Sequence, residues 1–290
     1  MSILITGANG VVGKDLVQIL SKKYKIFGFY RTKNSEVKKI KNVKWVKHNL
    51  KKKIKKIAPI PKYIVHCAVD QKNKNKNFDK YIDSNLEVLK NLVSFAEKNK
   101  VKLIINFSSI EVYGNIKKKI LDENYLPQNP NTYGLIKFLS EKYLFNKKIN
   151  FINMRLPGIL CKVNKYELKR PWLNLVFNNM KENKSILVHN IEGKFNNLTS
   201  TEEIAKFINF LIRKKTIIRD TFNFVCKKPL IMNEILNKAK KKLKSKSKII
   251  KLRNKNKSSF YISSKKLEYK LNFKTQTTKQ VIEKHLENFI

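Results

Sequence analysis

Several residue types are scarce in this sequence of 290 residues, and each shortage excludes a class of protein. Its three cysteines form no CxxC pair, so we expect free thiols in a reducing compartment and a cytoplasmic protein. Its four histidines lack the spacing of metal ligands, so we expect no metal site. No apolar run approaches the ~18 residues of a membrane-spanning helix. Because the first strand-like run begins at Ser2, we also expect no cleaved signal peptide.

Acidic residues are the largest shortage, because 21 Asp and Glu face 64 Lys and Arg and leave a formal net charge of +43. Such an excess is typical of nucleic-acid-binding proteins. However, only six of the basic residues are arginines, whose planar guanidinium suits phosphates and bases best. The 58 lysines accompany 34 asparagines and 33 isoleucines, and AT-rich codons encode all three. We therefore interpret the charge mainly as compositional drift, disfavour a nucleic-acid partner, and expect only a general preference for anionic ligands.

Strand-like and helical patterns alternate along the first half of the chain. Short apolar runs predict strands at Ser2–Thr6, Lys25–Tyr30, Val43–Lys47, Lys62–Ala68, Val101–Ser108 and Ile149–Leu156. Helical spacing of apolar residues predicts helices at Gly10–Lys22, Asp79–Asn99 and Thr132–Phe145. The later half is less regular, with a strand expected at Thr221–Val225 and helices at Tyr166–Glu182, Thr201–Lys214, Met232–Leu243 and Thr278–Phe289. This order predicts an α/β fold with a doubly wound, Rossmann-type parallel sheet and a smaller C-terminal α/β part.

Three of the eight glycines fall in the segment Gly7–Gly13, which reads G-x-x-G-x-x-G between a predicted strand and a predicted helix. Glycine permits a positive φ and lets a pyrophosphate approach the backbone closely. The free N–H groups at the start of the following helix then face that anion. A tight turn that packs the helix on the strand would use the same glycines. We expect a dinucleotide to bind at Gly7, Asn9, Gly10, Val11, Val12 and Gly13.

The end of the second predicted strand, Phe29–Lys33, reads FYRTK and holds no carboxylate. Dinucleotide-binding sites usually place Asp or Glu there, where it bonds the ribose hydroxyls. Arg31 can instead pair with a 2′-phosphate. The sequence therefore favours NADP(H) over NAD(H), with NAD(H) and an ordinary surface arginine as the alternative.

Tyr133 and Lys137 form a Y-x-x-x-K pattern near the start of a predicted helix, and the four-residue spacing puts both side chains on one face. A lysine ammonium close to a phenol favours the phenolate. We therefore expect Lys137 to lower the pKa of Tyr133 by at most about two or three units, which would make Tyr133 a general acid/base. Ser108 and Ser109 end a predicted strand, and chemistry gathers at that edge of a doubly wound sheet.

Together, Gly7–Gly13, Ser108–Gly114 and Tyr133–Lys137 resemble the motifs of the extended short-chain dehydrogenase/reductase family. The nearest branch is its NAD(P)-dependent nucleotide-sugar epimerases and dehydratases. The resemblance covers nearly the whole chain, because further stretches are similar to that branch: His66–Ala68, Asn85, Arg155–Gly158 and the tail from Phe222 onward.

The resemblance implies roles for individual residues. Ser109, Tyr133 and Lys137 would be catalytic, and Lys137 would also bond the nicotinamide ribose. The helices Asp79–Asn99 and Thr132–Phe145 often form dimers in such proteins, so we expect a homodimer. Besides Tyr133, Lys137 and the positions already named, the cofactor would contact Asn49, Leu50, Cys67, Ala68, Val69, Asn85 and Pro157.

The chain also departs from this branch. Ile110 stands where its dehydratases carry Asp, which disfavours 4,6-dehydratase chemistry. Gly158–Cys161 lacks the usual Asn and Gly-Pro, and we interpret Cys161 as a packing residue. The candidates for substrate contacts are Ser109, Glu111 and Arg170, with a purely structural role as an equal alternative for Glu111.

These features favour an enzyme that acts at C4 of a nucleoside-diphosphate sugar. The first interpretation is 4-keto reduction by NADPH with Tyr133 as acid/base. A 4-epimerase that retains NAD is the alternative, and a non-catalytic dinucleotide sensor or a polyanion-binding protein is more remote. We expect residues 1–158 to bind the dinucleotide, residues 186–216 to return to that domain, and residues 159–290 to form mainly the substrate-binding part.

Overall fold

The computed structural model describes residues 1–55, 57–70, 78–161, 171–252 and 260–289, and divides the chain into two compact units. The first unit comprises Met1–Gly114, Pro127–Arg155 and Ile204–Phe222. The second comprises Asn115–Leu126, Leu156–Glu203 and Asn223–Ile290. The segment that returns to the first unit overlaps the expected residues 186–216 but begins and ends later, and the short stretch Asn115–Leu126, between the second and third predicted motifs, belongs to the second unit.

The first unit contains the strands β1 (Ser2–Thr6), β2 (Lys25–Tyr30), β3 (Val43–Lys47), β4 (Tyr63–His66), β5 (Leu103–Ser109), β7 (Phe151–Leu156) and β12 (Arg219–Asn223). Its helices are α1 (Val11–Leu20), α2 (Phe78–Lys98), the 3-10 helix η1 (Ile110–Tyr113), α3 (Thr132–Phe145) and most of α5 (Thr201–Arg213). Every residue of β1, β4, β5 and β7 is buried, which explains why their sequences are mainly apolar. By contrast β3 exposes Lys44 and Lys47, as suits an edge strand.

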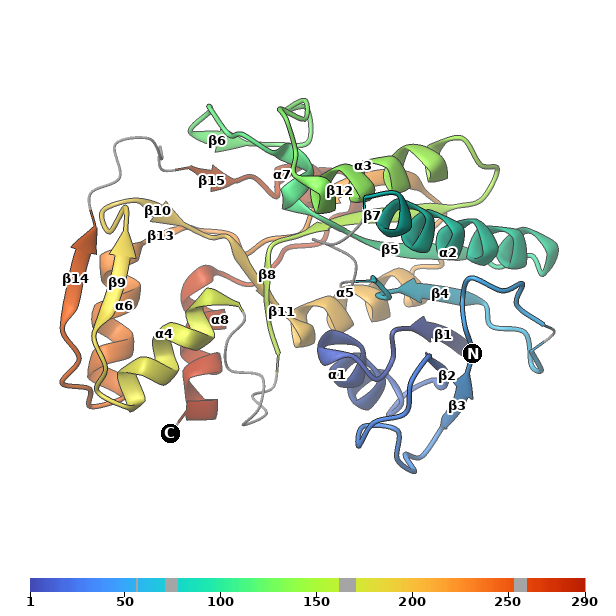
Figure 1. Ribbon diagram of the computed structural model, residues 1–290, viewed down its shortest axis with the longest axis horizontal. Helices are drawn as coiled ribbons and strands as arrows, with labels where there is room; N and C mark the ends of the chain where they lie inside the picture. The colour runs from blue at the N-terminus through green and yellow to red at the C-terminus, as the bar shows by residue number, and fades with distance from the viewer. Residues whose placement is uncertain (56, 71–77, 162–170, 253–259, 290) are drawn as a thin grey trace. The chain divides into compact units, whose positions relative to one another are not determined.

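These strands form one sheet in the order β12-β7-β5-β4-β1-β2-β3. The pairs β1–β2, β2–β3, β1–β4 and β4–β5 run parallel. Helices α2 and α3 lie on one face of the sheet, and α1 and α5 lie on the other (Figure 1). The predicted doubly wound Rossmann-type sheet is thus confirmed. The strand order changes direction between β1 and β4, and in such sheets ligands bind at the carboxyl ends of the strands near that point.

A buried chain of polar side chains joins three strands at one side of this sheet. The amide of Asn106 on β5 donates to the Asn153 side chain on β7 over 2.8 Å. Asn153 in turn donates to the Thr221 hydroxyl on β12 over 3.0 Å. Because buried amides must be paired, these bonds favour one alignment of the three strands.

The second unit consists of short strands and helices. Its strands are β6 (Ile120–Leu121), β8 (Gly158–Leu160), β9 (Ile186–His189), β10 (Lys194–Phe195), β11 (Leu198–Ser200), β13 (Leu230–Ile231), β14 (Ile249–Leu252) and β15 (Tyr261–Ile262). They pair as β6–β15, β8–β11 and β9–β14 in parallel and as β10–β13 in antiparallel fashion. The helices are α4 (Trp172–Lys181), α6 (Met232–Lys242), α7 (Lys265–Leu271), α8 (Thr278–Leu286) and the 3-10 helix η2 (Glu287–Phe289).

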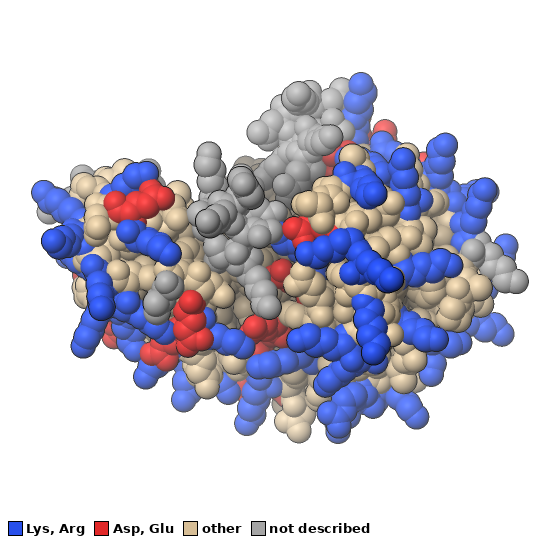
Figure 2. All heavy atoms as spheres, turned by 90° about the horizontal axis from the view of Figure 1, so that it is seen from below, with Lys and Arg blue, Asp and Glu red and all other residues tan. Residues whose placement is uncertain are grey.

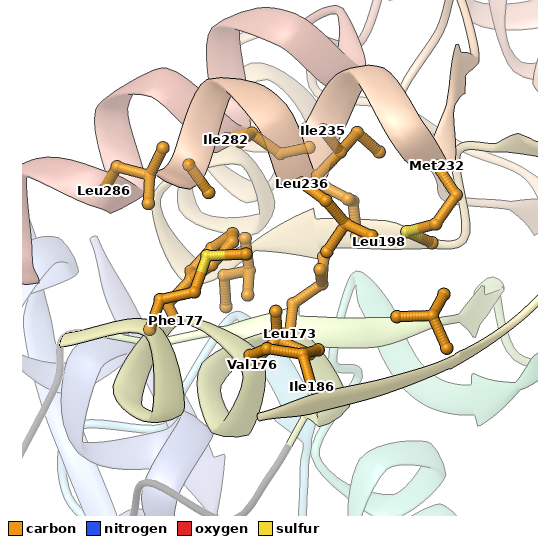
Figure 3. Packing of buried hydrophobic residues seen from close by; sticks show 14 of the residues in the cluster. Leu173, Val176, Phe177, Ile186, Leu198, Met232, Ile235, Leu236, Ile282 and Leu286 are labelled. Atoms are coloured by element: carbon orange, nitrogen blue, oxygen red, sulfur yellow. The ribbon is translucent and has the colours of Figure 1, made fainter. Parts of the chain in front are cut away.

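The core of the second unit lies among α4, α6 and α8, whose apolar side chains point toward one another (Figure 3). Phe177 of α4 and Ile235 of α6 are fully buried, and Ile282 of α8 is nearly so. The strand β9 contributes Ile186 and Val188 to the same cluster and exposes Leu187 and His189. The second unit is therefore held mainly by packing of helices.

Most expected elements occur within two residues of their predicted ends. The described part of the expected helix Tyr166–Glu182 is α4, and the expected strand Thr221–Val225 lies two residues earlier as β12. The strands β6, β8, β9, β10, β11, β13, β14 and β15 and the helix α7 were not expected, because pieces this short carry little periodic pattern. Cys161 is buried, as its interpretation as a packing residue requires.

The lysine excess lies on the surface. Lys and Arg side chains are dispersed over the whole face shown in Figure 2, with few acidic residues among them. A dispersed charge agrees with its interpretation as a property of composition. Among the helices of the described residues, none is both long enough and apolar enough to cross a lipid bilayer.

Candidate active site

A cavity of about 580 Å³ opens at the carboxyl ends of β1, β2, β3 and β4 in the first unit. Most of the residues expected to contact a cofactor line it: Gly7, Asn9, Gly10, Val11, Val12, Gly13, Arg31, Asn49, Leu50, Cys67, Ala68, Val69 and Asn85. Residues that the sequence had not singled out line it too, namely Phe29, Tyr30, Thr32, His48, Lys51, Asp70, Ser84 and Val88. Their signal in the sequence was a position at or just after the end of a strand, or on the helix that follows β4.

The glycine-rich loop packs so tightly that side chains would not fit. Gly7 has a φ of +64°, and a Cβ there would lie 3.0 Å from the Ala68 Cα. A Cβ on Gly13 would lie 2.1 Å from the carbonyl oxygen of Gly7, which is less than van der Waals contact. The first turn of α1 begins directly at the cavity, where its free N–H groups suit an anion. This cradle fits the pyrophosphate of a dinucleotide.

The segment after β2 is fastened to the glycine-rich loop. The Asn9 amide donates to the Thr32 carbonyl over 2.7 Å, and the Asn34 amide donates to the Asn9 carbonyl over 2.9 Å. Glu36, the nearest carboxylate after β2, lies 3.6 Å from the ammonium of Lys14 on α1. The cavity lining after β2 consists of Arg31 and Thr32 and includes no carboxylate.

Two further connections shape the floor of the cavity. The Thr6 hydroxyl lies 2.8 Å from Nδ1 of His66 and accepts from the backbone N–H of Ala68 over 3.2 Å. Burial lowers the pKa of His66 to about 3, so that the imidazole is neutral near pH 7. Asn85 accepts from the backbone N–H of Asp70 over 3.0 Å and thereby ties the chain after β4 to helix α2.

The structure brings Ser109, Tyr133 and Lys137 together beside this cavity. Tyr133 is hydrogen-bonded to the Ser109 side chain. The Lys137 ammonium lies 5.6 Å from the centre of the Tyr133 ring and donates to the Phe107 carbonyl over 2.7 Å. Lys137 also interacts electrostatically with Cys67, which lines the cavity, so the three side chains adjoin the dinucleotide cradle.

We expected Lys137 to lower the pKa of Tyr133, but in the folded protein this pKa is raised. Burial raises the pKa of Tyr133 to about 12, the hydrogen bond with Ser109 acts in the opposite direction, and the charge of Glu111 raises the pKa further. Burial also lowers the pKa of Lys137 to about 8. Desolvation therefore outweighs the attraction that the sequence led us to emphasise, and Tyr133 is a protonated phenol near neutral pH.

Glu111 connects the segment after β5 to the start of α3. Its carboxylate accepts a 2.7 Å hydrogen bond from Asn131, whose own side chain accepts from the Gly134 N–H and caps α3. A Cβ on Gly134 would lie 2.0 Å from the Glu111 carbonyl oxygen, so the two segments are in direct contact. These contacts give Glu111 a structural role, and its role as a substrate ligand stays a prediction.

Some expected site residues lie elsewhere. Pro157 lies between β7 and β8, outside the lining of the cavity, because the chain leaves the sheet there. Arg170 falls outside the described residues. Neighbouring Trp172 begins α4 and is 40% exposed, so it is not a core residue.

Comparison with known proteins assigns the chain to a family. The sequence model of the NAD dependent epimerase/dehydratase family matches residues 3–223. A GDP-6-deoxy-D-talose 4-dehydrogenase of Aggregatibacter actinomycetemcomitans is 29% identical over 151 residues, which are 51% of this chain and 48% of that enzyme. The matched part thus spans about half the length of this relative.

A second relative is matched over more of its length. It is the N-acetyl-alpha-D-glucosaminyl-diphospho-ditrans,octacis-undecaprenol 4-epimerase of Escherichia coli O157:H7, 24% identical over 254 residues, or 84% of this chain and 73% of that enzyme. The fold is similar to that of the UDP-N-acetylglucosamine 4-epimerase of Methanobrevibacter ruminantium M1, with a TM-score of 0.80, 18% identity and coverage of 99% and 97% of the two chains. The chain therefore belongs to the NAD dependent epimerase/dehydratase family.

Proposed function

We propose that this enzyme reduces the 4-keto group of a nucleoside-diphosphate sugar and uses NADPH as its reductant. The observation that carries the proposal is the composition of the cavity wall after β2, where Arg31 is present and a carboxylate is not. A guanidinium at this position suits the 2′-phosphate of NADP(H), whereas a carboxylate would repel it. NADPH serves as a consumed reductant, which favours net reduction over epimerisation.

The position of Glu36 supports this choice of cofactor. It is the carboxylate that could approach the adenosine ribose from the segment after β2, but it is directed at Lys14, which is itself 5% exposed. The two asparagine contacts of the same segment keep Thr32 against the glycine-rich loop. Arg31 is thus the charged side chain that this segment offers to the cavity.

The catalytic roles follow from the arrangement of Ser109, Tyr133 and Lys137. When bound, NADPH supplies the hydride that is added to the C4 carbonyl carbon. Tyr133 gives its proton to the carbonyl oxygen, for which its protonated state near neutral pH is suitable. Ser109, hydrogen-bonded to Tyr133, would donate to the same oxygen, and Lys137 would orient the cofactor ribose and stabilise the phenolate that remains. Tyr133 then regains a proton from solvent.

The substrate and the setting of the reaction are part of the proposal. Residues 159–290 would supply most contacts to the nucleoside diphosphate, with Glu111 and Arg170 as candidates. The free thiols of Cys67, Cys161 and Cys226 fit a cytoplasmic enzyme. A homodimer formed by α2 and α3 stays a prediction.

The test is absorbance at 340 nm with NADPH and a panel of 4-keto nucleoside-diphosphate sugars, for the wild type and for Arg31→Asp. We expect turnover by the wild type and a rise of roughly 100-fold in the NADPH Michaelis constant of the variant, since about 3 kcal/mol separates a paired from a repelled phosphate. Unchanged NADPH preference in Arg31→Asp would contradict the cofactor assignment.

The 4-epimerase is the second candidate, and the observation in its favour is the Escherichia coli 4-epimerase, which aligns with most of this chain. An epimerase of this type would retain its dinucleotide through purification. No NADPH oxidation with any substrate of the panel, together with tightly bound NAD in the purified protein, would replace the reductase by the epimerase.

A further inference from the structure

One buried carboxylate beside the active site has no role in the proposed mechanism. Glu141 lies one helical turn after Lys137 on α3 and is 2% exposed. A chain with so few acidic residues places this one in its interior, where an ionised carboxylate is costly unless it is paired. Its partners therefore indicate what it holds in place.

Glu141 joins the end of β5 to β7. Its Oε1 accepts from the Ser108 hydroxyl over 2.5 Å, and Ser108 directly precedes Ser109. The Arg155 guanidinium of β7 donates to both carboxylate oxygens, from Nε over 3.0 Å and from an Nη over 2.8 Å. This bidentate pair fixes the orientation of the carboxylate more strictly than a single bond would.

The same stretch of β5 is held by Lys137 from the neighbouring turn of α3. Lys137 donates to the carbonyl of Phe107, and Glu141 accepts from the next residue, Ser108. Helix α3 is therefore hydrogen-bonded to the two consecutive residues of β5 that precede Ser109. The arrangement sets the distance between Ser109 on β5 and Tyr133 on α3.

Arg155 is itself fixed from the other side. Its guanidinium lies 4.7 Å from the centre of the Tyr113 ring, and Tyr113 is fully buried at the end of η1. The guanidinium is thus stacked on the segment that follows Ser109 while it holds Glu141. Both sides of the Ser109 segment are connected to the same ion pair.

The charge of Glu141 also bears on Lys137. The groups that act on Lys137, directly or through Tyr133 and Glu141, come from several elements. Its own helix presents Tyr133 and Glu141, and β4 and the residue after it present His66 and Cys67. Tyr81 of α2 interacts electrostatically with Tyr133 and with Asp70. Arg155 of β7 donates a hydrogen bond to Glu141. Cys67 and Glu141 act on Lys137 directly; burial raises the pKa of the Cys67 thiol, whereas the Glu141 carboxylate is paired with the Arg155 guanidinium.

We propose that Glu141 is a positioning residue: it aligns Ser109 with Tyr133 through Ser108 and Arg155, and it keeps the Lys137 side chain cationic. The proposal concerns the proposed catalytic residues, but the state of Lys137 is measurable without substrate or cofactor. Burial lowers the pKa of Lys137, and Cys67 and Glu141 act in the opposite direction.

The test is trace acetylation of the folded protein across pH 6 to 10, with the Lys137 peptide quantified by mass spectrometry. Only the free amine reacts, so the midpoint of labelling reports the Lys137 pKa. We expect Glu141→Gln to lower this midpoint by about one pH unit. Ser108→Ala keeps every charge and should leave the midpoint unchanged, and so should Glu97→Gln, which neutralises an exposed carboxylate of α2.

A carboxylate that is merely structural would leave the midpoint of Glu141→Gln at the wild-type value, and this result would overturn the proposal. Glu141→Asp keeps the charge and should keep the midpoint while it loses thermal stability. Because Glu141→Gln leaves Arg155 without its charged partner and can prevent folding, the double variant E141Q/R155M provides a second measurement. It should also lower the midpoint, but by less, because the Arg155 cation is removed together with the carboxylate, and an unshifted midpoint there would equally contradict the proposal.

Discussion

The two units of this protein bury their apolar residues by different means. The first unit does so with a parallel sheet whose inner strands are fully buried, and the carboxyl ends of four of its strands meet at one edge and form a cavity there. The second unit has strands of two to four residues and relies on the packing of α4, α6 and α8. The comparison teaches that a ligand cavity is built where parallel strands end together, while the helical core of the second unit serves stability.

The strongest way to probe this comparison is to open the helical core. Phe177 is fully buried in the second unit and packs edge-on against Phe289 at a centroid distance of 5.6 Å. Phe177→Ala should lower the free energy of unfolding by about 4 kcal/mol, because a large cavity replaces the ring. Urea denaturation followed by circular dichroism measures the loss.

Leu175→Ala on the same helix is the matched control, since Leu175 is 38% exposed, and it should cost less than about 0.5 kcal/mol. If the two variants lost equal stability, packing of the helices would not be what holds the second unit.

A substitution in the glycine-rich loop of the first unit should instead weaken the binding of the dinucleotide. Gly13→Ala places a Cβ against the Gly7 carbonyl and should weaken NADPH binding by about 100-fold, or about 3 kcal/mol, because the loop must move away from the pyrophosphate. Titration by NADPH fluorescence measures the change. Gly158→Ala in the second unit, whose Cβ would meet the Pro171 ring at 3.0 Å, should bind NADPH as the wild type does. Equal weakening in both variants would refute a specific role of the cradle.

The smallest expected effect is a loss of folding stability at acidic pH. His285 in the second unit lies 2.7 Å from the Asn174 side chain, and burial lowers its pKa to about 4. The unfolded chain, with a His pKa near 6.5, binds more protons between pH 6.5 and 4, so stability falls as the pH is lowered through this range. His285 should account for about 2 kcal/mol of the loss between pH 7 and 5.

His285→Gln keeps a hydrogen-bonding side chain and removes this titration, so thermal unfolding at pH 7 and 5 should differ less than in the wild type. Exposed His189→Gln serves as the control. His66 in the first unit contributes acid sensitivity to both proteins, so part of the loss should remain. An undiminished loss in His285→Gln would show that His285 is already protonated in the folded state at pH 5.

Much of the first unit could be predicted from the sequence, because its signals are local. An apolar run such as Ser2–Thr6 predicts a buried strand, and the spacing of Gly7, Gly10 and Gly13 predicts a phosphate loop. The positions after other strands, such as Arg31 and Ala68, then follow from the geometry of a parallel sheet, and they line the same cavity. Their function as cofactor ligands stays a prediction.

The rest depended on contacts that no local pattern encodes. The pKa of Tyr133 is set by burial among α2, α3 and β5, whereas the sequence displays only its spacing from Lys137. The strands β6 and β15 are two residues each and exist because segments far apart in the chain pair with each other. Likewise, the sequence does not distinguish Glu141 from other helical residues, because its contacts with Ser108 and Arg155 form only in the folded protein.

The place of β12 has a consequence for how the protein is made. Residues 219–223 complete one side of the central sheet, where Thr221 receives the hydrogen bond of Asn153. While the chain emerges from the ribosome, β7 is available long before β12, and until then its outer backbone groups have no strand to pair with. The nascent Rossmann sheet is thus open at this edge while residues 157–218 are being synthesised.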